Sequence, residues 1–427
     1  MEATLELDHP HTGERAVLVH VNFSGEDARE SLDELKELAE TAGAKVVATV
    51  TGVRSSPDAK YFVGSGKAEE IRTTVLLEEA DLILVNHPLT PAQERNLERF
   101  CECRVLDRTG LILDIFAQRA RTAEGILQVE LAQLQHLSTR LIRGWTHLER
   151  QKGGIGLRGP GETQLETDRR LLRDRIKHIN KRLDKVRSQR EQNRRARQRS
   201  AIPTISVVGY TNAGKSTLFN RLTGAEVYVA DQLFATLDPT MRKIDLHGRG
   251  SAIVTDTVGF IRHLPHDLVE AFSATLEETR DASLLLHVVD LSDVNWRENI
   301  VQVQNVLSEI EADKVPQILI FNKIDRVKDL VPHVEKDEHG KPSKVWVSAR
   351  SGAGLDGLVE AIANALYGDP LQRSVLLTPQ EGKLRAELYQ VAAVLSERVD
   401  EEGNWIISVR IGRDDFERLL GGREEHS

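Results

Sequence analysis

Residues 209–216 constrain the fold of this chain more than any other segment, because they read GYTNAGKS between an apolar stretch and an amphipathic one. The preceding TISVV is rich in β-branched residues, as buried strands are, and the following TLFNRL has the spacing of a helix that buries one face. Glycines in such a loop let the backbone turn tightly and direct its N–H groups at one anion. The sequence therefore predicts a phosphate-binding loop formed by Gly209, Tyr210, Thr211, Asn212, Ala213, Gly214, Lys215, Ser216 and Thr217.

Two side chains of this loop have the chemistry that a nucleoside triphosphate requires. Lys215 would contact the β and γ phosphates, and the hydroxyl of Ser216 would bind Mg²⁺. A second motif follows the strand-like AIVT and consists of Asp256, Thr257, Val258 and Gly259. Its carboxylate would hold Mg²⁺ through water, and the N–H of its glycine would contact the γ phosphate.

The base is predicted from two further motifs, each placed after a strand-like stretch. The motif Asn322, Lys323, Ile324 and Asp325 follows QILIF. The carboxylate of Asp325 would accept from the ring N–H and the exocyclic amine of guanine, groups that adenine does not offer. The motif Ser348, Ala349 and Arg350 follows KVWV and would present a backbone N–H to the guanine carbonyl oxygen. In this order and at strand ends, the motifs predict a domain that binds GTP.

A switch segment should supply a threonine for Mg²⁺ and the γ phosphate. The sequence FATLDPT at residues 234–240 offers Thr236 and Thr240, and its resemblance to the switch of translation-associated GTPases favours Thr236. The alternative is that both threonines only cap a turn before Pro239. We expect Lys215, Thr236 and Gly259 to form the catalytic set.

Phe260 occupies a position at which Ras-like GTPases have a glutamine that orients the attacking water. A phenyl ring cannot hydrogen-bond water, so we expect slow intrinsic hydrolysis that a partner accelerates. The ring could also simply pack beneath a mobile switch loop, and the two interpretations are compatible.

One segment carries a charge opposite to that of the rest of the chain. The formal net charge is −9, yet residues 140–200 hold nineteen lysines and arginines against seven acidic residues, most densely at residues 187–199. A run of charge is usually a solvated helix face. A basic segment on an acidic chain nevertheless favours binding to a polyanion.

The same segment has the apolar spacing of a helical hairpin. Two series of apolar residues recur at coiled-coil intervals, the first with Ser138 in a gap: Leu127, Leu131, Leu134 and Leu141, then Leu172, Ile176, Ile179, Leu183 and Val186. Residues 152–162 between them contain five glycines and one proline, which predicts a non-helical tip. With Lys152 and Arg158 inside it, we expect this tip to contact a nucleic-acid backbone rather than to serve only as a flexible connection.

The remaining patterns predict an α/β fold with mostly parallel sheets. Strand-like residues 16–21, 45–50 and 81–85 alternate with helix-like residues 26–42 and 90–100, and a helix over 380–398 precedes a strand over 404–410. We predict an N-terminal α/β domain at residues 1–120, a basic helical hairpin at 121–200 with its tip at 151–161, a GTPase domain at 201–369 and a small α+β domain at 370–427.

Composition restricts the setting of the protein. Only two cysteines occur, Cys101 and Cys103, which form neither a disulfide framework nor a zinc site and fit a reducing cytoplasm. Neither a signal-like N-terminus nor eighteen consecutive apolar residues occur, so we expect no membrane insertion. With no apolar face left unassigned, we expect a monomer.

The stretch GGIGLRGPGETQLETDRR at residues 153–170, followed by these GTPase motifs, resembles the HflX family of ribosome-associated GTPases over nearly the whole chain. The resemblance implies binding to the large ribosomal subunit and its RNA, with the tip directed to the peptidyl-transferase region, and GTP-dependent separation of stalled or stressed ribosomes. It also implies that Ser216 and Thr236 bind Mg²⁺. The switch residues that it brings to the nucleotide are Phe234, Ala235, Thr236, Leu237 and Asp238. The ending Ser-Ala-Arg replaces the commoner Ser-Ala-Lys, a difference that leaves the backbone contact intact.

Two other functions stay open. The loop VGSGK at residues 63–67 precedes a helix, so the N-terminal domain could bind ATP and drive RNA remodelling. That loop lacks the full phosphate-loop spacing and a serine or threonine after its lysine. Alternatively, the GTPase could time binding to a membrane protease, which would place the protein beside a membrane through its partner.

Overall fold

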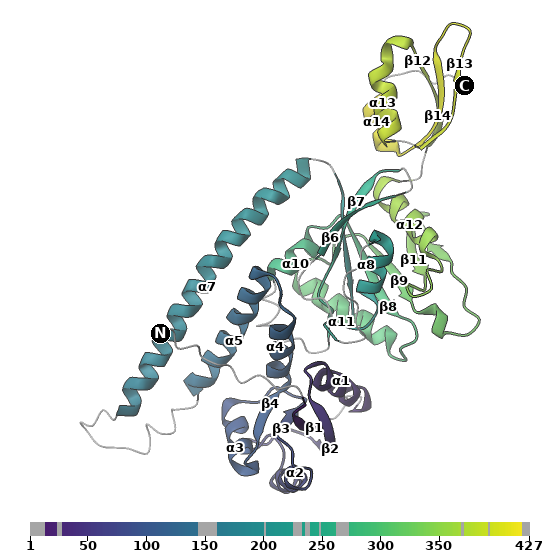
Figure 1. Ribbon diagram of the computed structural model, residues 1–427. Coiled ribbons are helices and arrows are strands. Elements are labelled where there is room, and N and C mark those ends of the chain that lie inside the picture. Colours follow the sequence, from purple (N-terminus) through teal and green to yellow (C-terminus); the bar gives the residue numbers. More distant parts are fainter. Residues whose placement is uncertain are drawn as a thin grey trace. The chain divides into compact units, whose positions relative to one another are not determined.

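The chain divides into two compact units that are described separately. The computed structural model describes residues 13–23, 28–143, 160–199, 202–224, 233–234, 240–246, 249–261, 273–368, 371–391 and 393–420. The first unit is formed by residues 1–191, 231–238 and 263–272, and the second by residues 192–230, 239–262 and 273–427 (Figure 1). The four-domain division expected from the sequence is finer than this one and stays a prediction.

The first unit contains a four-stranded parallel sheet in the order β2-β1-β3-β4. Its elements are β1 (Arg15–Phe23), α1 (Ala28–Thr41), β2 (Lys45–Arg54), α2 (Ser65–Leu77), β3 (Leu82–Val85), α3 (Pro91–Cys101), β4 (Arg104–Asp107) and α4 (Arg108–Arg119). Helices α2 and α3 pack on one face of the sheet, around Ile71, Leu97 and Ile83. All four residues of β3 are buried, which explains why its sequence is continuously apolar.

The predicted helical hairpin is present, and α7 (Pro160–Arg199) runs alongside α5 (Ala123–Arg143) (Figure 1). The described seam between them consists of Leu127, Leu131, Leu134, Leu172, Ile179 and Leu183, with Leu137 and Ile176 packed against it. An ion pair joins the two helices, since Arg175 Nη2 lies 2.6 Å from Glu130 Oε1. The side chain of Leu141 lies outside the described residues.

The prediction that residues 152–162 are wholly non-helical is wrong at their C-terminal end, because α7 begins at Pro160. Proline is favoured at the first position of a helix, where its N–H has no partner to lose and its φ is already helical. The rest of the predicted tip, residues 151–159, lies outside the described residues.

The second unit contains a seven-stranded sheet in the order β10-β11-β9-β8-β5-β7-β6, which is parallel except at its two edge strands. Its strands are β5 (Thr204–Gly209), β6 (Thr240–Asp245), β7 (Ser251–Asp256), β8 (Leu284–Asp290), β9 (Gln317–Asn322), β10 (Val334–Lys336) and β11 (Pro342–Trp346). Its helices are α8 (Lys215–Thr223), α10 (Ser273–Arg280), α11 (Trp296–Glu309), the 3₁₀ turn η1 (Ile324–Arg326) and α12 (Leu355–Tyr367). Helices α8 and α12 share a core with the sheet around Phe219, Ile362 and Val207.

The C-terminal segment forms an antiparallel sheet in the order β12-β14-β13, and the predicted helix over residues 380–398 is wrong in its second half. Its elements are β12 (Leu371–Leu377), η2 (Pro379–Glu381), α13 (Gly382–Val391), β13 (Ala393–Val399), β14 (Trp405–Ile411) and α14 (Arg413–Leu420). Asp400 Oδ1 accepts from the backbone N–H groups of Glu402 and Asn404, at 2.9 and 2.8 Å. This turn brings β13 back along β14, and strand pairing overrides helix propensity.

Cys101 is buried, Cys103 is partly buried, and both are free thiols. No helix among the described residues is both long enough and apolar enough to cross a bilayer.

Replacing Ile179 with alanine should weaken the hairpin seam, because this side chain is fully buried between α5 and α7. Burial of this kind predicts a loss of about 2–4 kcal/mol in the free energy that opens the hairpin. Hydrogen exchange of the α7 amides measures this free energy of opening. The matched control is Leu171→Ala, whose side chain is 53% exposed on the same helix and should change little. Equal losses in the two variants would contradict this seam.

Candidate functional site

The sequence motifs meet at one edge of the seven-stranded sheet. Strands β5, β7, β8 and β9 are parallel, so their carboxyl ends lie along the same edge. Gly209, Asp256 and Asn322 are the last residues of β5, β7 and β9. This edge is where open α/β sheets bind ligands.

Two glycines of the phosphate loop sit where no other residue fits. Gly209 has φ +148°, and a Cβ on it would lie 2.3 Å from the carbonyl oxygen of Val288. Gly214 has φ +92°, and its Cβ would lie 2.3 Å from Asn322 Nδ2. The loop therefore lies against β8 and against the guanine motif, and α8 begins at its end.

Lys215 and Ser216, the first residues of α8, turn toward the loop and toward β7. Lys215 Nζ donates to the carbonyl oxygen of Tyr210 at 2.7 Å, and Ser216 Oγ donates to Asp256 Oδ2 at 2.8 Å. Burial lowers the pKa of Lys215 to about 8, although Asp256 opposes the shift. A hydroxyl and a carboxylate placed together are oxygen donors of the kind that Mg²⁺ prefers.

The motif after β7 packs directly onto the loop. A Cβ on Gly259 would lie 2.9 Å from Thr211 Cγ2 and 3.0 Å from Lys215 Nζ, so only glycine allows this approach. Thr257 is buried and its hydroxyl donates to the carbonyl oxygen of Val207 at 2.6 Å. Its neighbour Val258 is also buried.

Phe260 is held by its backbone on both sides, with its side chain 2% exposed. Its carbonyl oxygen accepts from Thr211 N at 2.8 Å, and its N–H donates to the carbonyl oxygen of Gly209 at 3.1 Å. The residue that follows Gly259 is therefore a buried packing residue, as one interpretation of the sequence expects. No polar side chain is supplied to the site from this position.

Asn322 joins the phosphate loop to the guanine loop. Its Nδ2 donates to the carbonyl oxygen of Ala213 at 2.8 Å, and its Oδ1 accepts from the backbone N–H of Ala349 at 2.9 Å. The adjacent Lys323 has φ +62°, and its ammonium forms an ion pair with Asp290 at 2.7 Å.

Asp325 lies beside the last motif, since Ser348 Oγ donates to Asp325 Oδ1 at 2.5 Å. The contact to guanine predicted for the backbone of residues 348–350 stays a prediction. The amides of Ser348 and Ala349 already donate, to the carbonyl oxygen of Ala353 and to Asn322. Within this described turn, the amide of Arg350 is the donor that these contacts do not use.

Arg221 is a site residue that the sequence motifs do not reveal. It lies in α8 and reaches the guanine loop, with Nε donating to the carbonyl oxygen of Ala349 at 3.1 Å and Nη2 to that of Arg350 at 2.7 Å. Its only sequence signal is an arginine on the helix that follows the loop, which is also the pattern of a solvated helix face.

The switch residues are only partly described. Residues 235–239, which include Ala235, Thr236, Leu237 and Asp238, lie outside the described ranges, so the choice of Thr236 stays a prediction. Thr240 begins β6 and is paired with Asp256 on β7. Phe234 belongs to the first unit, where its ring packs edge-on against Phe116 with centroids 4.7 Å apart.

The loop before α2 does not have the geometry of a second phosphate loop. Gly64 has an ordinary φ of −68°, and a Cβ on it would lie 2.4 Å from Arg54 Nη1, so a side chain occupies the space beside it. Lys67 Nζ is engaged by Glu70 at 2.7 Å. These contacts give no support to ATP binding at this loop.

The chain is similar to known GTPases. Three family models match: GTP-binding GTPase N-terminal over residues 29–117, GTP-binding GTPase Middle Region over 119–197, and 50S ribosome-binding GTPase over 204–323. The chain is 58% identical over 413 residues to GTPase HflX of Escherichia coli K12, covering 97% of each chain. It is 46% identical over 406 residues to GTPase HflX of Magnetococcus marinus, covering 94% and 93%. A solved complex of SsGBP with GDP aligns at 26% identity over 82% of this chain and 97% of that one, with a TM-score of 0.47.

Nucleotide affinity should fall as the pH rises above about 8, because Lys215 must be protonated to attract phosphates and its pKa is lowered to about 8. Above that pH, binding of GDP must first return a proton to the lysine, which weakens binding about tenfold per pH unit. Calorimetry at pH 8.5 in buffers of different ionisation enthalpy should therefore show proton uptake. At pH 7 this uptake should nearly vanish, and equal uptake at both pH values would contradict the assignment to Lys215.

Replacing Arg221 with methionine should loosen the guanine loop, because two backbone carbonyls lose their charged donor. Hydrogen bonds of this type predict a fall in GDP affinity of about tenfold. Fluorescence titration with a labelled GDP measures it. Arg242→Met is the matched control, since this exposed arginine donates, among the residues that the structure describes, to the carbonyl of its neighbour Met241. Unchanged affinity in Arg221→Met would exclude a role in holding the loop.

Proposed function

Because this chain belongs to the HflX family of GTPases, we propose that it binds the large ribosomal subunit and uses GTP to separate stalled or stressed ribosomes. The chain binds GTP and hydrolyses it to GDP and phosphate, through a phosphate loop on an α/β sheet. The ribosomal partner and the separation of subunits are the proposed part. The proposal places the protein in the cytoplasm, where ribosomes are.

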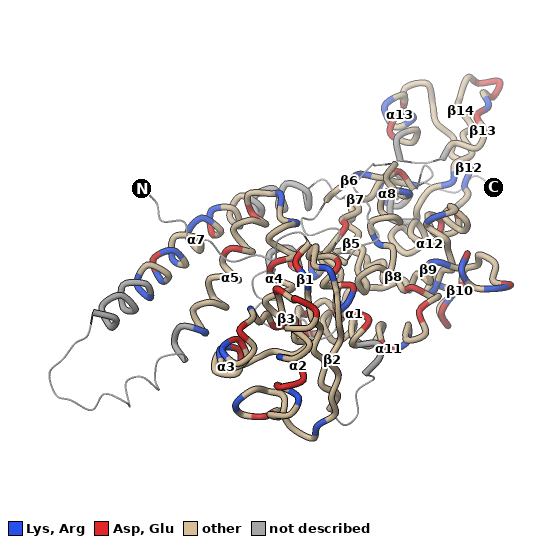
Figure 2. The backbone as a smooth tube through the Cα atoms, turned by 60° about the horizontal axis from the view of Figure 1, so that its bottom comes forward, with Lys and Arg blue, Asp and Glu red and all other residues tan. Residues whose placement is uncertain are grey.

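The observation that carries the proposal is the exposed face of α7. Seven of its described cations are exposed to solvent, although Arg175 among them also pairs with Glu130 of α5: Arg170, Arg173, Arg175, Lys177, Lys181, Arg182 and Lys185. Figure 2 shows them as a blue series along the helix, interrupted by few acidic positions. Such a linear series of cations on a rigid helix fits the phosphate backbone of a structured RNA. The match to a 50S ribosome-binding GTPase over residues 204–323 supports ribosomal RNA as this partner.

Magnesium fits the pair formed by Ser216 and Asp256. The hydroxyl and the carboxylate lie 2.8 Å apart at the start of α8 and the end of β7, where a metal bound to the phosphates of GTP would need oxygen ligands. In the proposal Ser216 and Thr236 would hold Mg²⁺, with Asp256 acting through water, and the metal would supply positive charge to the β and γ phosphates. Lys215 would contact the same phosphates.

In the proposal, the GTP-bound and GDP-bound states differ in the contacts that protein groups make with the γ phosphate. Gly259 lies against Thr211 and Lys215, which supports the proposal that its N–H contacts that phosphate. When GTP is hydrolysed, this contact is lost and the segments that follow relax. Because Phe260 is buried and apolar, the intrinsic reaction is slow in this proposal, and the ribosome supplies or orders the missing group.

Co-sedimentation with large ribosomal subunits tests the proposal. The wild-type protein should bind more tightly with a non-hydrolysable GTP analogue than with GDP, and added salt should weaken binding steeply. The triple variant Lys177→Ala, Lys181→Ala and Lys185→Ala should lose at least about tenfold in affinity and show a shallower salt dependence.

The matched control removes three exposed lysines outside the hairpin, at positions 336, 341 and 383, and should bind normally. Separation is measured by light scattering of intact ribosomes after addition of GTP. Equal subunit affinity with the GTP analogue and with GDP would refute the proposal. Equal losses of affinity in the two triple variants would also refute it.

A further inference from the structure

Helix α5 presents two different faces to two different partners. Leu127, Leu131 and Leu134 form the seam with α7. A second stripe at helical spacing contains the buried Val129 and Ala132, followed by His136 and Arg140. Helix α5 also contacts α4, and Arg140 reaches α3 and β4. The hairpin is thus attached to the α/β sheet by α5.

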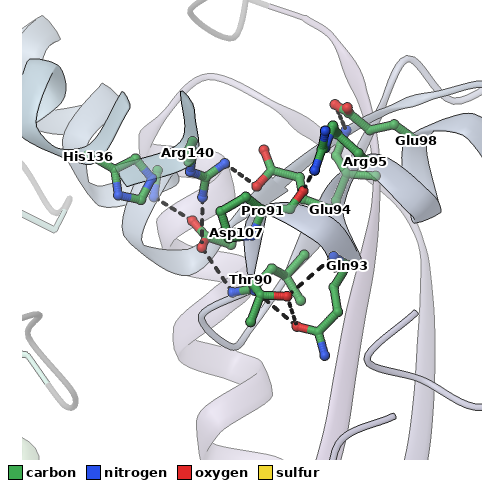
Figure 3. A network of polar contacts seen from close by, with 12 residues as sticks. Thr90, Pro91, Gln93, Glu94, Arg95, Glu98, Asp107, His136 and Arg140 are labelled. Carbon is green, nitrogen blue, oxygen red and sulfur yellow. Dashed lines mark hydrogen bonds and ion pairs between the residues drawn. The ribbon is translucent and has the colours of Figure 1, made fainter. Parts of the chain in front are cut away.

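Arg140 makes the last of these attachments before the hairpin tip. Its Nη1 donates to Glu94 Oε2 on α3, and its Nη2 forms an ion pair with Asp107 Oδ2 at 3.0 Å. Figure 3 shows the guanidinium between the two carboxylates, with His136 beside Asp107. The arginine side chain is 17% exposed and that of Asp107 only 2%. One side chain therefore joins three elements of the first unit.

Both carboxylates are held in place by their own helices. Asp107 is the N-cap of α4, accepting from the backbone N–H of Gly110 at 2.8 Å and from that of Leu89 at 3.1 Å. Glu94 lies in the first turn of α3, which Thr90 caps. Helix N-termini favour negative charge, so these acceptors are in position independently of the arginine.

The stability of the domain is a poor explanation for this cluster. The buried carboxylate of Asp107 and the partly buried one of Glu94 share one guanidinium. Burial raises the pKa of Glu94 to about 7 against the opposing effect of Arg140. Buried ion pairs of this kind contribute little net stability, because desolvation offsets their attraction. They do discriminate between alternative packings, since a displaced arginine leaves uncompensated charge.

The length of α5 explains why the choice between alternative packings at Arg140 matters. Arg140 lies seventeen residues beyond Ala123, where α5 starts. This corresponds to about 25 Å along the helix. A rotation of about 10° at the α4–α5 turn would move the far end of α5 by about 4 Å, and anything beyond it by more. An anchor at Arg140 therefore removes most of this freedom.

We propose that Arg140 is a positioning residue, which fixes the direction in which the hairpin leaves the α/β sheet by binding Glu94 and Asp107 together. It contacts no nucleotide in this role. Its consequence for ribosome binding rests on the function proposed above, because a misdirected hairpin would present its cations and its tip at the wrong place.

Spin labels test the direction directly, without any ribosome. In a background with Cys101→Ala and Cys103→Ser, labels at Leu77→Cys on α2 and Lys181→Cys on α7 occupy exposed positions in the same unit. The distance distribution between them should be narrow in this background and clearly broader with Arg140→Met. The double variant Arg140→Met and Glu94→Gln should also broaden it, and it removes one buried negative charge that could otherwise prevent folding.

Arg175→Met is the matched control, because it removes the same charge from the hairpin and breaks only the α5–α7 ion pair. This control should keep the narrow distribution. A distribution that stays narrow in the folded double variant, or that broadens equally in the control, would overturn the inference.

Binding to purified large subunits then separates the two proposals. Arg140→Met should lose about tenfold in subunit affinity with GDP affinity unchanged, and Arg175→Met distinctly less. If the distribution broadens but subunit affinity stays the same, the link from hairpin direction to binding is wrong. If the wild-type protein itself does not bind subunits, the proposed function fails while the positioning role of Arg140 stands on the distance measurement.

Discussion

The nucleotide site depends on one amide side chain more than on any other contact. Asn322 donates to the carbonyl of Ala213 and accepts from the amide of Ala349, so the phosphate loop and the guanine loop are held at a fixed separation. Gly214 lacks a side chain where this amide passes. The distance between phosphate and base recognition is therefore set by the protein through a hydrogen-bonded crosslink between β9 and two loops.

The two units are similar in one respect. In each, an arginine on a helix binds acceptors on other elements and so holds a loop or a hairpin in place. In the second unit, Arg221 of α8 holds the carbonyls of Ala349 and Arg350. In the first, Arg140 of α5 joins Glu94 and Asp107. In both places an arginine spans elements distant in sequence, since its long side chain with several donors reaches two acceptors at once.

Much of the fold could be predicted because its signals are local. The strand before Gly209, the helix after Ser216 and the seam from Leu172 to Leu183 each follow from spacing within a short window. Residues 393–399 could not be assigned in this way, since they suit a helix as well as a strand. Their pairing with β14, made possible by the turn at Asp400, determines the outcome. The start of α7 at Pro160 was missed for a related reason, because surrounding glycines outweigh the one residue that begins a helix well.

The amino-acid sequence alone was sufficient to predict the chemistry proposed for this protein: a phosphate loop, a carboxylate at Asp325 for guanine, and a basic helix suited to a polyanion. The phosphate loop and the guanine motif are short motifs at strand ends, and parallel strands bring them to one edge of the sheet. The partners of Arg140, Arg221 and Asn322 emerge only in the folded chain. Each bond joins residues far apart in sequence. From the sequence alone, a polar residue on a helix is predicted to face solvent, and only the packing of the folded chain shows that an acceptor lies opposite it.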